Sequence, residues 1–445
     1  MKSAQDPNPI PSLLSTLGLW LKIGCISFGG PAGQIALIHR ELIEKRQWIS
    51  EQRFLHALNY CMVLPGPEAQ QLATYMGWLL HRTLGGIIAG LLFILPSLFV
   101  LMGLGWIYLQ YGEVPAVTGI FYGIKPAVSA IVIMAAYRIG RRTLNHPLLW
   151  LMTLASFAAI HYLDTPFPFI LLTAALLGSV LSARLDSKPH QDATHQPPLM
   201  GDDSEGFPHT RFKLTRCLTI LWVGLMLWCI PMGWLYLTFG WSVPLTQMAW
   251  FFTKASLLTF GGAYAVLPYV YQGVVEHYGW LTAEQMMDAL ALGETTPGPL
   301  IMVNTFTGFI TGWTQDILGS NSPFLGGTLA ALVVTYFTFL PSFIFILAGA
   351  PWVETSRATL RLKGPLTAIS AAVVGVILNL ALFFAGQVLF PEGVALAPDV
   401  KAIIILLFAG IALTRFKLGI IPVIMLSGGS GYLITALPNL IRVGF

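Results

Sequence analysis

The sequence predicts an all-α polytopic membrane protein built from two repeats. Of its 445 residues, 55% are hydrophobic and only 10% are charged, whereas soluble domains carry roughly 25% charged residues. Apolar runs such as 84–109 and 366–389 exceed the roughly 20 residues that a helix needs to cross a bilayer. The third observation is an internal repeat: motifs of the first half recur in the second half at a constant spacing.

The recurring motifs all keep the spacing that separates Lys22 from Lys254, and no gap is needed between the first and the last of them. We call two positions matched when they are related by this spacing. Duplicated halves that contain interrupted hydrophobic helices are typical of transporters whose site lies between the halves. The motif pairs are Lys22 and Lys254, Phe28-Gly29-Gly30 and Phe260-Gly261-Gly262, Glu44 and Glu276, Trp48 and Trp280, and Pro65-Gly66-Pro67 and Pro297-Gly298-Pro299.

Composition divides the chain into four parts. Residues 1–185 form a first membrane repeat, and 241–445 form a second. The polar segment 186–216 is rich in acidic residues, histidine and proline, so it buries too little apolar surface to fold. We expect a flexible cytoplasmic linker there, followed by an extra transmembrane helix at 217–240.

Positive charge predicts that the two repeats face opposite sides of the membrane. No Lys or Arg occurs from 255 to 356, whereas the matched window 23–124 carries five. Cytoplasmic loops are enriched in these residues. We therefore expect inverted-topology repeats, with the N-terminus and the linker in the cytoplasm and the C-terminus in the periplasm.

Each half is expected to contain about four spanning helices. Hydropathy places them at 84–109, 117–137, 147–163 and 166–183, and at 325–350, 364–389, 400–414 and 418–440. Each set is preceded by two broken segments that begin and end on the same charged side. We interpret these as re-entrant helical hairpins with N-caps at Ser50 and Thr282. Two kinked full spans are the alternative, and they leave the topology unchanged.

The breaks create four helix starts inside the membrane, near 30–33, 66–69, 262–265 and 298–301. A helix N-terminus carries roughly half a positive charge and is a ready anion site, and glycine lets a ligand approach the backbone. The alternative is that Gly and Pro only shape helix packing. Besides the motifs above, the neutral polar residues close to the breaks are Gln34, Gln70, Gln71, Thr295, Thr296 and Asn304.

Lys22 and Lys254 each lie shortly before a Phe-Gly-Gly break, inside apolar sequence. A lysine at the centre of a spanning helix costs on the order of 3 kcal/mol on insertion scales, so the pair implies an anionic partner. That partner is either the substrate or a structural carboxylate. Snorkelling of both side chains to the interface is the third interpretation.

Two acids are placed asymmetrically in the repeats. Glu68 directly follows the first Pro-Gly-Pro motif, and Glu294 precedes the second. An intramembrane carboxylate is a functional candidate by default. Each acid either couples proton movement to anion movement or neutralises one of the membrane lysines.

The sequence carries no signature of catalysis. It has no His-Glu-x-x-His pair, no Gly-Lys-Ser/Thr phosphate loop and no paired cysteines. The four cysteines are dispersed in apolar stretches and are interpreted as free thiols. We therefore expect no enzymatic activity, no metal and no cofactor, and we attribute the net charge of +4 to loop orientation rather than to nucleic acid.

The motifs resemble a known family. The runs Phe28-Gly29-Gly30-Pro31-Ala32-Gly33-Gln34 and Leu64-Pro65-Gly66-Pro67-Glu68-Ala69, with Trp48 between them, are similar to the bacterial chromate ion transporter (CHR) family in its two-domain form. The second copies are similar to its second domain. The resemblance covers nearly the whole chain apart from the linker and 218–237.

The resemblance implies export of chromate across the inner membrane, driven by the proton gradient and giving chromate resistance. The expected partners are then chromate or a similar oxyanion, protons and the lipid bilayer, and association as a homodimer is left open. A carrier of sulfate or of another oxyanion is the alternative within transport. A membrane scaffold or an intramembrane enzyme is the alternative from another class.

Overall fold

The computed structural model describes residues 11–28, 30–180, 210, 212–356, 363–391 and 397–443. Every regular element in these ranges is a helix, as the all-α prediction requires. The predicted linker lies almost entirely outside the described residues, and so does Gly29 of the first glycine motif.

The first half folds as two short helical hairpins followed by longer helices. Its elements are α1 (Leu13–Ile26), α2 (Gly30–His39), the π-helix η1 (Arg40–Glu44), α3 (Glu51–Val63), α4 (Glu68–Tyr111), α5 (Pro115–Thr143), α6 (Pro147–Leu163) and α7 (Phe167–Val180). The second half begins with the additional helix α9 (Leu214–Phe239) predicted at 217–240.

The remaining elements repeat this order. They are α10 (Pro244–Leu257), α11 (Ala263–Tyr271), the π-helix η2 (Gln272–His277), α12 (Ala283–Thr295), the 3₁₀ helix η3 (Leu300–Met302), α13 (Val303–Thr314), α14 (Pro323–Ser356), α15 (Lys363–Leu389), α16 (Val400–Thr414) and α17 (Ile420–Val443). Even the π-helices begin at matched positions, Arg40 and Gln272.

The predicted helix caps are present in both halves. The Ser50 hydroxyl accepts a hydrogen bond from the Arg53 N–H and starts α3. At the matched position Thr282 forms a reciprocal capping box with Gln285 and starts α12. Each cap satisfies N–H groups that the first turn of a helix leaves without intrahelical partners, so the local sequence is sufficient to fix where these helices begin.

A sharp bend divides α4 into the return arm of the hairpin and a long apolar helix. The bend lies at His81 and Arg82, and Arg82 has a positive φ of 57°. The two parts then pass closely: a Cβ on Gly77 would lie 2.4 Å from the carbonyl oxygen of Gly85. Only glycine permits this approach, so the bend depends on small residues on both sides of it.

Five helices of the described chain are long and apolar enough to cross a membrane, namely α4, α5, α9, α14 and α15. The predicted spans at 147–163, 166–183 and 400–414 correspond to the shorter apolar helices α6, α7 and α16. A helix of 15 residues such as α16 reaches only about 22 Å at 1.5 Å per residue. The protein is thus a multi-pass membrane protein with helices of unequal length.

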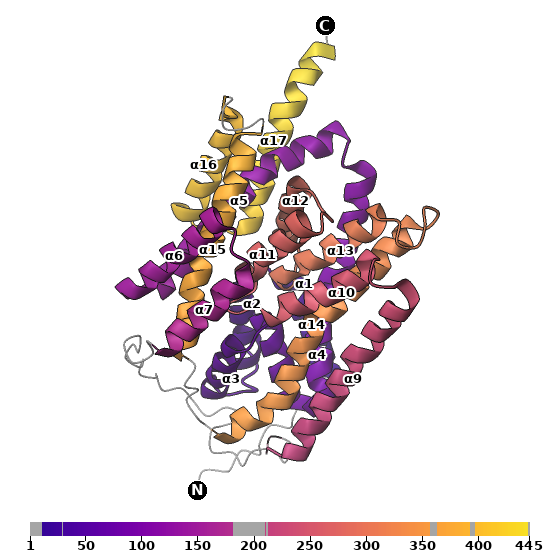
Figure 1. Ribbon diagram of the computed structural model, residues 1–445, viewed down its shortest axis with the longest axis vertical. Coiled ribbons are helices and arrows are strands. Elements are labelled where there is room, and N and C mark those ends of the chain that lie inside the picture. Colours follow the sequence, from indigo (N-terminus) through magenta and orange to yellow (C-terminus); the bar gives the residue numbers. More distant parts are fainter. Residues whose placement is uncertain are drawn as a thin grey trace.

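The two halves interleave rather than forming separate bodies. The first-half helix α5 packs against α15, α16 and α17 of the second half, and α4 packs against α14. Figure 1 shows α5 beside α16 and α17, and α4 beside α14. The buried residues form two clusters, and each contains residues of both halves, so neither half buries its apolar surface alone.

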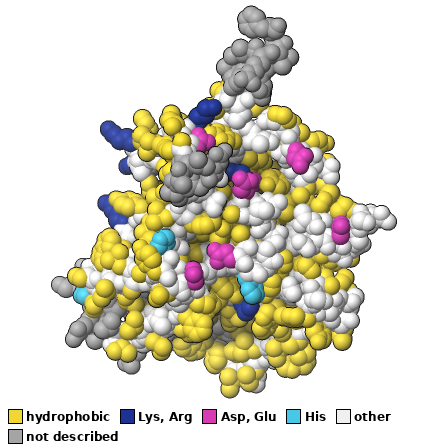
Figure 2. All heavy atoms as spheres, turned by 45° about the horizontal axis from the view of Figure 1, so that its top comes forward, with side chains coloured by type: hydrophobic (Ala, Val, Ile, Leu, Met, Phe, Trp, Pro, Cys, Tyr) yellow, Lys and Arg dark blue, Asp and Glu magenta, His cyan; other side chains and the backbone are white. Residues whose placement is uncertain are grey.

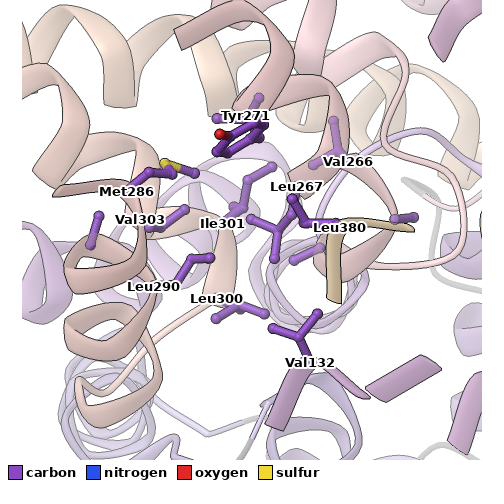
Figure 3. Packing of buried hydrophobic residues seen from close by; sticks show 14 of the residues in the cluster. Val132, Val266, Leu267, Tyr271, Met286, Leu290, Leu300, Ile301, Val303 and Leu380 are labelled. Carbon is purple, nitrogen blue, oxygen red and sulfur yellow. The ribbon is translucent and has the colours of Figure 1, made fainter. Parts of the chain in front are cut away.

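The shared core combines residues from both halves. In Figure 3, Val132 of α5 lies with Leu267, Leu300 and Leu380 from α11, η3 and α15. The outer surface is also apolar, and Figure 2 shows hydrophobic side chains over much of one face. Leu14 and Leu237, for example, are 82% and 85% exposed. Such extensive exposed apolar surface is expected where lipid is the solvent.

Figure 1 places α3 towards one end of the molecule and its counterpart α12 towards the other. We therefore predict opposite membrane sides for the matched turns at Gln47 and Gly279, which have positive φ values of 50° and 61°. In a variant without native cysteines, Gly279→Cys should react with an impermeant maleimide in intact cells. Gln47→Cys should react only after permeabilisation, and labelling of both from the same side would refute inverted repeats.

Candidate functional site at the helix breaks

All four predicted helix breaks are present, and the matched breaks share one backbone geometry. The breaks separate α1 from α2, α3 from α4, α10 from α11, and α12 from η3. Gly30 and Gly262 have positive φ values of 72° and 95°, and Gly66 and Gly298 have values of 129° and 101°. Because L-residues rarely adopt these angles, glycine is required at each of the four positions.

Breaks from opposite halves are joined by two matched hydrogen bonds. The Gly66 N–H donates to the Thr259 carbonyl at 2.8 Å, and the Gly298 N–H donates to the Ser27 carbonyl at 3.0 Å. Gly66 and Gly298 are matched positions, as are Ser27 and Thr259. The first-half donor thus has a second-half acceptor, and the reverse also holds. We name this region, residues 27–30, 64–67, 258–262 and 296–299, the crossover.

Two helices that contain an internal proline pack against the crossover. A Leu-Pro-Ser motif in α4, Leu95-Pro96-Ser97, recurs in α14 as Leu340-Pro341-Ser342. A Cβ on Gly66 would lie 2.3 Å from the Ser342 hydroxyl, and a Cβ on Gly298 would lie 2.8 Å from Cβ of Ser97. Each Pro-Gly-Pro break therefore packs against the Leu-Pro-Ser motif of the other half.

Several predicted neutral donors are used to hold the crossover together. The Gln34 amide donates to the carbonyls of Gly298 and Ser27, and the Gln71 amide donates to the Pro65 carbonyl at 2.7 Å. Gln70 donates to Thr74 within α4. The hydroxyls of Thr295 and Thr296 donate to carbonyls of their own helix. The donated hydrogen bonds position the breaks, whereas the side-chain oxygens of Gln70 and Gln71 are buried without a hydrogen-bond partner in the described chain.

We predicted an anion site at each of the four helix starts, which requires free N–H groups there, and this requirement is not met at Gly66 and Gly298. Their N–H groups bond to the opposite break, because an unpaired amide inside apolar surroundings would cost several kcal/mol. The buried polar atoms without hydrogen-bond partners among the described residues include instead the Ser97 and Ser256 hydroxyls and the side-chain amide of Asn304. Sequence reasoning identified Asn304 and missed the two serines.

The other predicted residues of the motifs surround this framework. Pro67 and Pro299 are the N-caps of α4 and η3, where a missing N–H costs nothing. Phe28 is 37% exposed beside the first break, and Phe260 is half-buried at the matched position. Gly261 faces the Ser370 hydroxyl, which would be 3.6 Å from a Cβ there. Pro297 is half-buried within the fourth break.

Both predicted acids approach the third break, at the start of α11. The Glu68 carboxylate would be 3.9 Å from a Cβ on Gly262. Glu294 is buried, and the Tyr264 hydroxyl donates a hydrogen bond to it. Glu68 thus lies close to the first residues of α11, and Glu294 contacts the side chain of the second residue of that helix.

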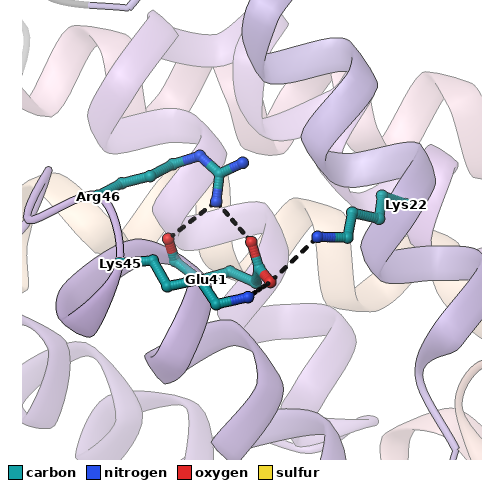
Figure 4. A network of polar contacts seen from close by, with 4 residues as sticks. All are labelled: Lys22, Glu41, Lys45 and Arg46. Carbon is teal, nitrogen blue, oxygen red and sulfur yellow. Dashed lines mark hydrogen bonds and ion pairs between the residues drawn. The ribbon is translucent and has the colours of Figure 1, made fainter.

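The two membrane lysines do not contact the breaks. Lys22 forms an ion pair with Glu41 at 3.2 Å, and Lys45 and Arg46 bind the same carboxylate at 2.8 and 2.5 Å (Figure 4). The Lys45 hydrogen bond is the largest of the effects that lower the pKa of Glu41 to about 2. Three cations thus share one carboxylate, which leaves this cluster with an excess positive charge of two.

Lys254 has a different environment. Its ammonium group lies 5.7 Å from the centre of the Trp250 ring, a cation–π distance. The residue that matches Glu41 in the second half is Gly273, and a Cβ there would lie 2.2 Å from the Phe251 ring. An aromatic side chain occupies the space beside Gly273, and the carboxylate that pairs with Lys22 has no counterpart.

The arrangement suits a neutral or anionic ligand better than a metal ion. Within the described residues, no group of three or more His, Cys, Asp or Glu side chains is placed to hold a metal. Serine hydroxyls and an asparagine amide donate hydrogen bonds, and helix N-termini add partial positive charge. These groups can donate hydrogen bonds to an oxyanion, and a carboxyl group such as that of Glu68 or Glu294 can hold a proton.

The chain is similar to known transport proteins. The chromate transporter family model matches residues 14–179 and 246–432. A chromate transport protein of Pseudomonas aeruginosa is 32% identical over 97% of this chain and 94% of its own. One of Cupriavidus metallidurans is 28% identical over 92% and 94%, and a probable one of Synechococcus elongatus is 30% identical over 83% and 84%. No solved structure matches.

The close packing of the Pro-Gly-Pro glycines yields a direct prediction. Gly66→Ala and Gly298→Ala place a Cβ against Ser342 or Ser97 at positive φ, so each should lose about 2–4 kcal/mol of stability. Thermal unfolding of the purified protein in detergent measures this. The control is Gly103→Ala, because no atom lies within 4 Å of a Cβ at that position. This variant should be as stable as the parent protein. Equal stability of all three variants would show that the crossover is not tightly packed.

Proposed function

Because the chain belongs to the chromate transporter family, we propose that it exports chromate from the cytoplasm across the bacterial inner membrane and thereby confers chromate resistance. The observation that carries the proposal is the crossover, where breaks from both halves meet beside buried, unpartnered donors. Discontinuous helices at the interface of two repeats are the usual location of a carrier's substrate site.

The electrical energy across the membrane supports the direction of transport. Moving one charge through 100 mV is worth about 2.3 kcal/mol, so a dianion gains about 4.6 kcal/mol on leaving a negative interior. That energy sustains a concentration ratio on the order of a thousandfold. The potential component of the proton-motive force therefore favours export of chromate, and Glu68 and Glu294 are the candidates for coupling to protons as well.

The cationic cluster around Glu41 has a complementary role in this proposal. It lies beside the charged loop that we assign to the cytoplasm, and its excess of two positive charges raises the local concentration of dianions. Lys22 then acts at the entrance rather than at the crossover. Lys254 remains our candidate for substrate attraction in the second half, and we propose no enzymatic activity.

Flux into inverted membrane vesicles tests the function. Vesicles containing the protein should accumulate labelled chromate when a positive interior potential is imposed, which corresponds to export in the cell. Vesicles without the protein should not. Lys22→Ala and Lys254→Ala should each lower the flux at least tenfold, and wild-type flux in both would remove the lysines from the transport path.

Sulfate is the substrate that this assay must exclude. It is a tetrahedral dianion of similar shape, and neutral donors with helix N-termini bind any such ion. Chromate should be transported in preference to sulfate, with sulfate as a weak competitor. Sulfate accumulation without chromate accumulation would replace the proposal by a sulfate carrier, and accumulation of neither would refute oxyanion transport.

The two acids at the third break predict the pH dependence of flux. Glu68→Gln and Glu294→Gln fix a neutral side chain, so the variant that removes the coupling proton should transport chromate at a rate independent of pH. Substrate affinity should stay within about threefold. Glu113→Gln, at an exposed position, is the control. If both variants kept the pH profile of the parent, neither acid would carry the coupled proton.

A further inference from the structure

A third buried acid lies outside the crossover, on the hairpin helix α12. Asp288 is only 3% exposed. Its Oδ2 accepts a hydrogen bond from the Tyr108 hydroxyl of α4 at 2.9 Å. Its Oδ1 is buried and has no hydrogen-bond partner among the described residues. An ionised carboxylate in this position would have one oxygen without solvation or partner, which is strongly unfavourable in apolar surroundings.

The nearest cation is engaged elsewhere. Lys125 of α5 pairs at 3.6 Å with Glu284, which lies one helical turn before Asp288 and has a side chain that is 73% exposed. Among the described residues, Tyr108, Lys125 and Glu284 are the titratable groups that act on Asp288. The described parts of the other elements packed on α12, namely α13, α17 and η3, contribute none. Glu284 is therefore placed between the buried carboxyl and water.

The matched position in the first half is also titratable. His56 is the residue that matches Asp288, and its Nε2 lies 3.2 Å from the Val353 carbonyl of α14. Val353 and Tyr108 are themselves equivalent, because each follows the proline of its Leu-Pro-Ser motif at the same distance along the chain. In each half, therefore, a hairpin helix contacts a long helix at equivalent positions. The hairpin helix contributes Asp288 in the second half and His56 in the first half.

We infer that Asp288 is a proton-binding site, and that it carries a proton in the conformation described here. The neutral carboxyl keeps the Tyr108 hydrogen bond and leaves no unpaired charge. When the proton leaves, Lys125 can transfer from the exposed Glu284 to the new carboxylate. Loss of the proton would thereby exchange the ion pair of Lys125 with Glu284, at the exposed side of α12, for one with Asp288 at its buried side, while the Tyr108 hydroxyl continues to donate to Asp288. A role for this exchange in proton coupling rests on the proposed function, whereas the bound proton does not.

Infrared spectroscopy of the purified, full-length protein tests the inference without any transport assay. At neutral pH the spectrum should contain the C=O stretch of a protonated, buried carboxyl, and Asp288→Asn should lose part of that band. Asp399→Asn is the control, because Asp399 caps α16 and accepts hydrogen bonds from the N–H groups of Lys401 and Ala402 and from the Tyr122 hydroxyl. An unchanged band in Asp288→Asn would overturn the inference.

A second measurement uses the unaltered protein, in case the variant does not fold. Dicyclohexylcarbodiimide reacts with protonated carboxyls in apolar surroundings, and mass spectrometry identifies the modified residue. Asp288 should be modified at neutral pH, and the extent should fall at least fivefold as the pH is raised. Modification of Glu68 and Glu294 without modification of Asp288 would contradict a proton at this position. If Asp288 were labelled but the protein did not transport chromate, the proposed function would be refuted and the inference of a bound proton would stand.

Discussion

The hydrogen bonds that join Gly66 to Thr259 and Gly298 to Ser27 are the constraint on which the rest of the structure depends. A helix that stops inside a membrane exposes backbone groups that lipid cannot satisfy. Here each break supplies the donor or acceptor that the opposite break lacks. Because the donors belong to different halves, neither repeat satisfies its own breaks, and the interleaved packing of α4 with α14 and of α5 with α15 to α17 follows from the same exchange.

The exchange also explains the residue types at the crossover. Glycine provides the positive φ and admits the neighbouring serine, proline ends the helix without losing a needed N–H, and glutamine ties the break to the adjoining helix. The buried side-chain atoms that remain unpaired near the breaks in the described chain include donors on Ser97, Ser256 and Asn304, together with the acceptor oxygens of Gln70 and Gln71. A site built from neutral donors and helix ends can release a dianion more easily than a site built from paired arginines, because no strong ion pair has to be broken.

Local sequence was sufficient to predict the helix breaks, the caps at Ser50 and Thr282 and the additional helix α9, because each depends on residues within one or two turns. It did not predict which breaks meet, because that is decided by packing between the two halves. The Leu-Pro-Ser motifs were missed since Pro96 and Pro341 are further apart than the matched positions are, so one fixed spacing does not reveal them. The partner of Lys22 was left open for a related reason: Glu41 has no counterpart in the second half.

We propose that chromate binds at the crossover and that the two lysines act elsewhere, and an experimental structure with bound chromate would test this most directly. Tetrahedral density is expected between the first break and the break at 296–299, within hydrogen-bond distance of Ser97 or Asn304. Chromate bound only at the Glu41 cluster, with the crossover sealed by side chains, would contradict it.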